Sequence, residues 1–102
     1  MSIFREGFDP ASRLMLKQAV TANSTEYLVS TVDLGLDHSF GDGPPLYYET
    51  MIFVNGEWDE LYMMRYSTEA EAKEGHVETV KAMQLEAFKI DERSIIFEGE
   101  IK

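Results

Sequence analysis

The chain contains no cysteine among its 102 residues. This absence excludes a disulfide framework, a thiolate nucleophile and any zinc or iron–sulfur site with cysteine ligands. Basic groups are also few: 9 Lys and Arg stand against 19 Asp and Glu, so the formal net charge is −10. A surface of this sign repels phosphate backbones, and the composition therefore disfavours binding to duplex nucleic acid.

Long apolar runs are absent as well. No stretch approaches the roughly 20 apolar residues of a membrane-spanning helix, and the N-terminal segment lacks the apolar core of a signal peptide. These absences predict a cytoplasmic protein with no membrane partner. A length of 102 residues with 44% hydrophobic content predicts a single small acidic domain over residues 1–102.

The negative charge is concentrated in the middle of the chain. Residues 26–66 carry eight acidic groups and one basic group, whereas residues 1–25 carry two acidic and three basic groups. Such a segment can form a surface that binds a basic protein, or a face that only keeps the chain in solution. Composition does not choose between these two roles.

The first third of the sequence predicts an arm followed by a hairpin. Residues 1–12 have no clean period, and we expect Phe4 and Phe8 in this arm to pack against the core. Asp9-Pro10 could begin a helix that runs to about Val20. The β-branched residues and period-2 pattern that follow favour a hairpin over residues 13–36 instead.

A second hairpin is predicted over residues 46–66. The dipeptide Asn55-Gly56 lies between "LYYETMIFV" and "WDELYMMRY" and is a strong hairpin signal. A two-residue turn would place Phe53 opposite Trp58 and Glu49 opposite Tyr62, whereas a longer loop through "VNGEWDE" would shift this register. The sequence leaves both registers open.

A helix is predicted over residues 68–83. Thr68 and Glu71 have the spacing of a capping box. Gly75 in the helix interior costs about 1 kcal/mol relative to alanine, so the helix either passes close to the sheet there or ends early. The predicted apolar stripe consists of Ala72, His76, Val80 and Met83.

Together these elements define an α+β fold. Residues 94–101 alternate in polarity and predict a final strand. We expect an antiparallel sheet of about four to five strands, made of the two hairpins and this C-terminal strand, packed against one helix.

Residues 29–53, "VSTVDLGLDHSFGDGPPLYYETMIF", and the later "RYSTEAEAKEGH" resemble a family of small uncharacterised bacteriophage and prophage proteins. The family pattern resembles STV-x-LGLDH-x-FG-x-GPP-x-x-x-ETM-x-F, followed by RYST and a later GH. The resemblance covers residues 29–76 and implies a phage-type origin and one small domain, with no catalytic residues to carry over. Asp33 stands where the family pattern has Trp, and "VNGEWDE" replaces a more glycine-rich turn.

Residues 37–45, "DHSFGDGPP", form a predicted glycine- and proline-rich loop. A phosphate-binding loop is disfavoured because Pro44 and Pro45 have no N–H and Asp42 adds negative charge. Gly41 and Gly43 permit unusual backbone angles, and the two prolines fix the approach to the next strand. We therefore expect the loop to form a stiff corner between two strands. A binding role for the residues at its edge is a second interpretation.

The chain has two histidines, His38 in this loop and His76 on the predicted helix. With the carboxylates of Asp37 and Glu49 they have the side-chain types of a metal or acid–base site. Their spacing lacks the regularity of a helical metal pair, and a helix histidine on an apolar stripe is more often a core residue. We predict no catalytic residue, metal or cofactor, and retain a small-ligand, metal-binding or enzymatic site around this loop as the alternative.

The second predicted hairpin is rich in aromatic residues and methionine. Because strand residues alternate between faces, one helix cannot cover all of these side chains. The rest form either a protein-binding or self-association surface, or a second layer under the arm and tail. We expect a phage-type accessory protein that binds a protein partner through a surface that includes Trp58 and Tyr62. The partner is either a basic host factor, which the protein would modulate in the host cytoplasm, or a second copy of the chain.

Overall fold

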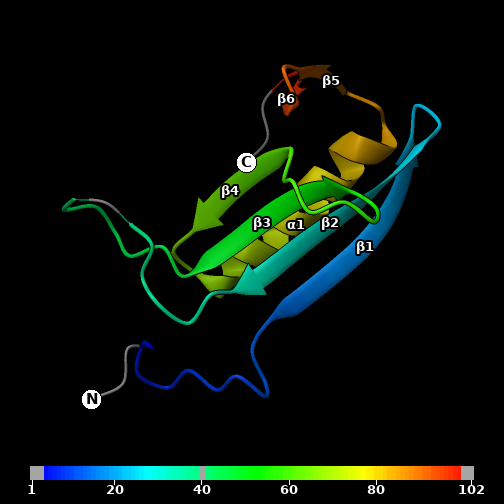
Figure 1. The fold of residues 1–102 in the computed structure, drawn as a ribbon. Helices are drawn as coiled ribbons and strands as arrows, with labels where there is room; N and C mark the ends of the chain where they lie inside the picture. The colour runs from blue at the N-terminus through cyan, green and yellow to red at the C-terminus, as the bar shows by residue number, and fades with distance from the viewer. Residues whose placement is uncertain (1–3, 40, 100–102) are drawn as a thin grey trace.

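Two hairpins form one antiparallel meander that packs on a single helix. The computed structural model describes residues 4–39 and 41–99. In it β1 (Met15–Ala22), β2 (Thr25–Asp33), β3 (Tyr48–Val54) and β4 (Tyr62–Tyr66) pair in the order β1-β2-β3-β4. Helix α1 (Glu69–Gln84) covers one face of this sheet (Figure 1). The predicted α+β fold is confirmed.

The β1–β2 hairpin turns at Asn23 and Ser24. These residues have φ of 49° and 65° and lie between the paired Ala22 and Thr25. Two consecutive positive φ values define a type I′ turn, whose twist matches that of the strands. The helix proposed from Asp9 onward does not form: the Asp9 carboxylate accepts hydrogen bonds from Ala11 and Ser12 in a local turn, and the chain enters β1 at Met15.

The β3–β4 hairpin has the longer of the two loops considered. Ile52 lies opposite Tyr62 and Glu49 opposite Arg65, so residues 55–61 connect the strands. A first turn closes where the Glu57 N–H donates to the Val54 carbonyl at 2.9 Å, and the chain then bulges outward before it pairs again. The two-residue-turn register is therefore not formed.

Helix α1 begins with the capping box that the sequence predicts. The Thr68 hydroxyl accepts a hydrogen bond from the Glu71 N–H, and the Glu71 carboxylate accepts one from the Thr68 N–H, both at 3.1 Å. The predicted stripe is buried. Val80 and Met83 of this stripe join residues of the sheet and of the C-terminal segment in one core, made of Val20, Ala22, Tyr27, Val29, Ile52, Val80, Met83, Phe88 and Ile95.

The C-terminal strand does not extend the main sheet. β5 (Phe88–Asp91) and β6 (Ser94–Phe97) pair only with each other and form a separate two-stranded sheet. Phe88 packs edge-to-face on Tyr27, and Phe97 packs in the same way on Tyr62, so this hairpin closes one end of the core. Residues 100 and 101 of the predicted strand 94–101 lie outside the described residues.

The N-terminal arm lies at the opposite end of the sheet. Phe4 and Phe8 stack with ring centroids 5.0 Å apart. They lie against Gly35, where a Cβ would come within 2.8 Å of both rings, so the arm needs a glycine at this position. Residues 1–3 lie outside the described residues. Among those described, no helix is long and apolar enough to cross a membrane.

Candidate functional site

The face of the sheet opposite α1 is rich in apolar side chains. Thr31 and Thr50 point toward the helix, so the alternate residues of each strand point the other way. We call this second surface the outer face. Its side chains are Met15, Lys17, Ala19 and Thr21 of β1, Glu26, Leu28, Ser30 and Val32 of β2, Glu49, Met51 and Phe53 of β3, and Met63 and Arg65 of β4.

Several of these apolar side chains remain open to solvent. Met15 is 48% exposed and Met63 45% exposed, and Leu28 and Phe53, which lie opposite each other, are half-buried. Trp58, from the loop between β3 and β4, is 93% exposed. Trp and Met side chains exposed to solvent beside a half-buried Phe are typical of a protein-binding surface.

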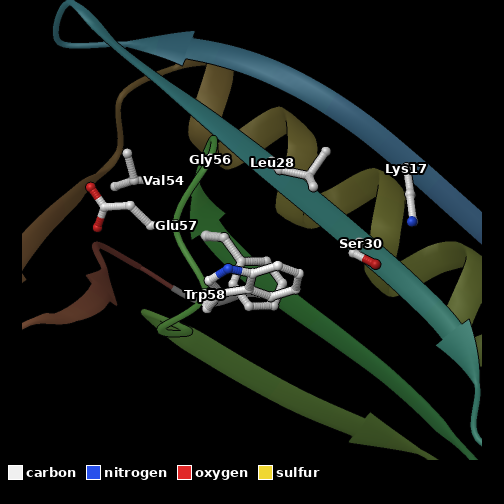
Figure 2. Close-up of a pocket in the computed structure, with 8 residues that line it drawn as sticks. Lys17, Leu28, Ser30, Val54, Gly56, Glu57 and Trp58 are labelled. Carbon is white, nitrogen blue, oxygen red and sulfur yellow. The ribbon is translucent and has the colours of Figure 1, made fainter.

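A shallow pocket of about 180 Å³ lies between Trp58 and the outer face. Figure 2 shows the Trp58 indole beside β2 and β3, with Ser30 on β2 and Lys17 on β1. The pocket is lined by Lys17, Leu28, Ser30, Phe53, Val54, Gly56, Glu57 and Trp58. It is therefore an apolar hollow with one cation and one carboxylate at its rim.

Charges on the outer face are partly neutralised within it. Glu49 is buried and forms an ion pair with Arg65 at 2.9 Å. Lys17 and Glu57 have no ion-pair partner among residues 4–39 and 41–99. Much of the net charge of −10 lies elsewhere, so a nearly neutral apolar surface sits on a strongly acidic protein.

The loop that carries Trp58 is fixed at both ends. The Asn55 N–H donates to the Glu26 carbonyl at 2.9 Å, and the Asn55 side-chain amide donates to the Glu26 carboxylate. At the other end the Leu61 carbonyl accepts a hydrogen bond from the Ile95 N–H at 2.7 Å. The indole is thus presented by a loop whose ends are hydrogen-bonded to β2 and β6.

Asp37 acts as a clamp at the base of the glycine- and proline-rich loop. Its carboxylate accepts hydrogen bonds from the N–H groups of Ser39 and Leu46, each at 2.8 Å, and from the Ser39 hydroxyl at 2.9 Å. The hydrogen bonds from Leu46 and Ser39 lower the pKa of Asp37 below its usual range. Gly41, Gly43, Pro44 and Pro45 are all exposed beyond this clamp, and Phe40 lies outside the described residues.

His38 contributes its backbone to the same corner. Its N–H donates to the Leu46 carbonyl at 2.9 Å, and its carbonyl accepts from Arg65 Nη1 at 3.4 Å. Because Arg65 also pairs with Glu49, the loop base is joined to β3 and β4. His38 and Glu49 are therefore linked through one guanidinium group.

His76 lies on the other side of the sheet, between α1 and the strands. Its Nδ1 is 2.6 Å from the Thr31 hydroxyl, which is 2.6 Å from the Thr50 hydroxyl, and the Tyr66 hydroxyl donates to Thr50 at 3.2 Å. In one arrangement Tyr66 donates to Thr50, Thr50 donates to Thr31, and Thr31 donates to an unprotonated Nδ1 of His76. Each of the three hydroxyls and Nδ1 then has a hydrogen-bond partner. Burial lowers the pKa of His76, which favours this neutral form.

The four residues of the alternative ligand site are thus not brought together. Glu49 and His76 lie on opposite faces of the sheet, and Asp37 is occupied with its own loop. Within the described part of the chain no group of three or more His, Asp or Glu residues could hold a metal ion. Of the predicted protein-binding pair, Trp58 lies beside the outer face, whereas Tyr62 points to the helix side and packs on Phe97.

Sequence reasoning missed the contribution of the first hairpin. Lys17, Leu28 and Ser30 line the pocket because β2 pairs with β3. The period-2 pattern of residues 27–36 signals a face, but it does not reveal which strand lies beside it.

An ion pair between Arg5 and Asp33 was also missed. Arg5 donates to the Asp33 carboxylate and lies over the rings of Phe8, Tyr47 and Tyr48, with distances of 5.1 to 5.4 Å to the ring centroids. Burial alone would raise the pKa of Asp33, but the hydrogen bonds from Arg5 and the Gly35 N–H lower it overall. Asp33 thus anchors the arm.

Comparisons with protein-family models, with curated proteins and with solved structures found no match to this chain.

Proposed function

We propose that this chain is a small acidic accessory protein of bacteriophage type that binds a protein partner through the outer face and Trp58. The observation that carries the proposal is the position of the one tryptophan of the chain, 93% exposed beside an apolar pocket. A large aromatic side chain beside a hollow is the usual composition of an interface anchor. The resemblance of residues 29–76 to phage proteins supports the phage-type role and a place in the host cytoplasm.

The partner is expected to be a basic protein. Trp58 is flanked by Glu57, Asp59 and Glu60, and the chain as a whole is strongly negative. A partner with an apolar contact and basic groups around it would be complementary to this arrangement, and its association would be faster at low salt.

The test compares two exposed apolar side chains. Tagged wild-type protein, Trp58→Ala and Leu85→Ala are incubated with host lysate, and the captured proteins are identified by mass spectrometry. Leu85 is 68% exposed at the end of α1 and serves as the matched control. We expect wild type and Leu85→Ala to capture the same partner in a salt-sensitive manner, and Trp58→Ala to lose it. Equal capture by Trp58→Ala would refute a role for this surface.

The small-ligand alternative has less support, because the sheet separates His76 from Glu49 and the loop of Asp37 and His38. It predicts thermal stabilisation by a metal ion or nucleotide in a ligand panel, with the stabilisation lost in His38→Ala. A result of that kind would favour the loop around Asp37 and His38 as the functional site.

A further inference from the structure

Among residues 4–39 and 41–99, no strand pairs with the outer edge of β1. The strand order places β1 at the end of the sheet, and Figure 1 shows it as the outermost strand. It pairs with β2 in unbroken register from Met15–Val32 to Ala22–Thr25, without a bulge or a proline. Its single charged residue is Lys17. Edge strands are usually protected by bulges, prolines or several charges, and β1 has only this one lysine.

The hairpin hydrogen bonds determine which groups of β1 point outward. The Asp33 N–H donates to the Leu14 carbonyl at 3.0 Å, and the two-residue turn closes on Ala22 and Thr25. Since hydrogen-bonded pairs alternate along an antiparallel ladder, even-numbered β1 residues bond to β2 and odd-numbered residues direct their N–H and C=O groups away. These outward residues are Met15, Lys17, Ala19 and Thr21.

We infer that β1 pairs antiparallel with β1 of a second copy, so that two four-stranded sheets join into one around a twofold axis at Gln18. In this register Met15 lies opposite Thr21 of the second copy, and Lys17 lies opposite Ala19. All four outward residues then enter hydrogen-bonded pairs. This inference is independent of the proposed partner surface, because it uses the backbone at the sheet edge.

The side chains of β1 are self-complementary in this register. Gln18 lies opposite Gln18 of the second copy, where the two amides can hydrogen-bond, and Leu16 lies opposite Val20. A register centred on Lys17 would place the two Lys17 ammonium groups opposite each other, where they repel. A register centred on Ala19 would leave Met15 without a paired residue at the end of the strand. β1 carries no acidic residue, so the acidic groups that dominate the net charge do not lie on the contacting strands.

Single-cysteine variants test the register directly, because the chain has no cysteine of its own. Gln18 forms a non-hydrogen-bonded pair with its own copy, with Cα atoms about 4.5 Å apart, which suits a disulfide. The two copies of Lys17 are offset by two residues along the strands, and so are the two copies of Ala19. Their Cα atoms therefore lie about 8 Å apart, which is too far for a disulfide. We expect Gln18→Cys to form a disulfide dimer under mild oxidation at least about tenfold faster than Lys17→Cys or Ala19→Cys. Equal rates for the three variants would overturn the register.

The assembly state provides the second test. Analytical ultracentrifugation of the wild type should give twice the chain mass of 11.7 kDa. Ala19→Pro removes an outward N–H while leaving the β1–β2 ladder intact, and should be monomeric, whereas Ala19→Ser keeps that N–H and should remain dimeric. Circular dichroism verifies that both variants are folded. A wild type that is monomeric at the highest concentration reached, or a folded Ala19→Pro that stays dimeric, would overturn the inference.

Discussion

Gly75 of α1 lies directly against the ring of Tyr66 of β4. A Cβ added at Gly75 would be 2.5 Å from two ring carbons of Tyr66, far inside van der Waals contact. The Tyr66 ring is held in place by the hydrogen bond from its hydroxyl to Thr50. The helix can therefore approach the sheet this closely only because residue 75 has no side chain.

Gly75→Ala is expected to destabilise the protein despite the better helix propensity of alanine. The gain of about 1 kcal/mol in propensity is outweighed by overpacking, which typically costs 1–3 kcal/mol, so the two terms leave a net loss of up to about 2 kcal/mol. Urea unfolding gives the measurement. In a Tyr66→Ala background the same substitution should become neutral or stabilising, and a loss of stability unchanged by that background would contradict the steric explanation.

His76 should make stability depend on pH in the weakly acidic range. Its folded pKa is lowered by burial, so the unfolded chain takes up a proton first, at about pH 6.5. Stability is then fully present above this pH and falls as the pH decreases toward the folded pKa. The carboxyls with lowered pKa, Asp33 and Asp37, lose their contribution only at lower pH, below their ordinary value of 3.8.

The measurement is the unfolding free energy from urea titrations between pH 8 and pH 3, in which His76 acts between pH 8 and pH 5. His76→Gln should remove the slope in this window while leaving the acid loss near pH 4 and below. A slope that persists in His76→Gln would assign the effect to another group.

The glycine- and proline-rich loop should contribute to stability through its prolines. Replacing Pro44 and Pro45 by Ala is expected to lower stability by roughly 1–2 kcal/mol, because the unfolded chain gains freedom. His38→Ala should leave the melting temperature nearly unchanged, since its observed hydrogen bonds are made by the backbone. Thermal unfolding distinguishes the two variants. A neutral proline variant together with a destabilised His38→Ala would reverse these assignments.

Duplex DNA should not bind at physiological salt. The net charge of −10 leaves no electrostatic attraction to a phosphate backbone. A gel-shift titration into the micromolar range checks this expectation, and a sequence-independent shift there would contradict it.

The features that the sequence predicts correctly are those determined by local chemistry. The Thr68–Glu71 capping box and the helix stripe depend on residues only a few positions apart. The two-residue β5–β6 turn was not anticipated, because Glu92 and Arg93, both at positive φ, are not residues that usually signal a type I′ turn.

Long-range features required the structure. The pairing of β2 with β3 spans the loop clamped by Asp37, and no local pattern specifies it. The same pairing completes the outer face. The excess of aromatic residues in the second hairpin therefore predicts an exposed surface, but the residues that β1 and β2 add to this surface could not be derived from the sequence. The ion pair of Arg5 with Asp33 joins positions far apart in the chain and has no signal in the sequence.

The anchoring of the Trp58 loop has a thermodynamic consequence. Its ends are joined to β2 through Asn55 and to β6 through Leu61, so folding has already restricted its backbone before any partner arrives. Association would then need to immobilise the indole, at about 0.5–1.5 kcal/mol for one side chain, and the loop residues between the two anchored ends. Anchoring at both ends favours recognition in which the base of the loop keeps its position when the partner binds.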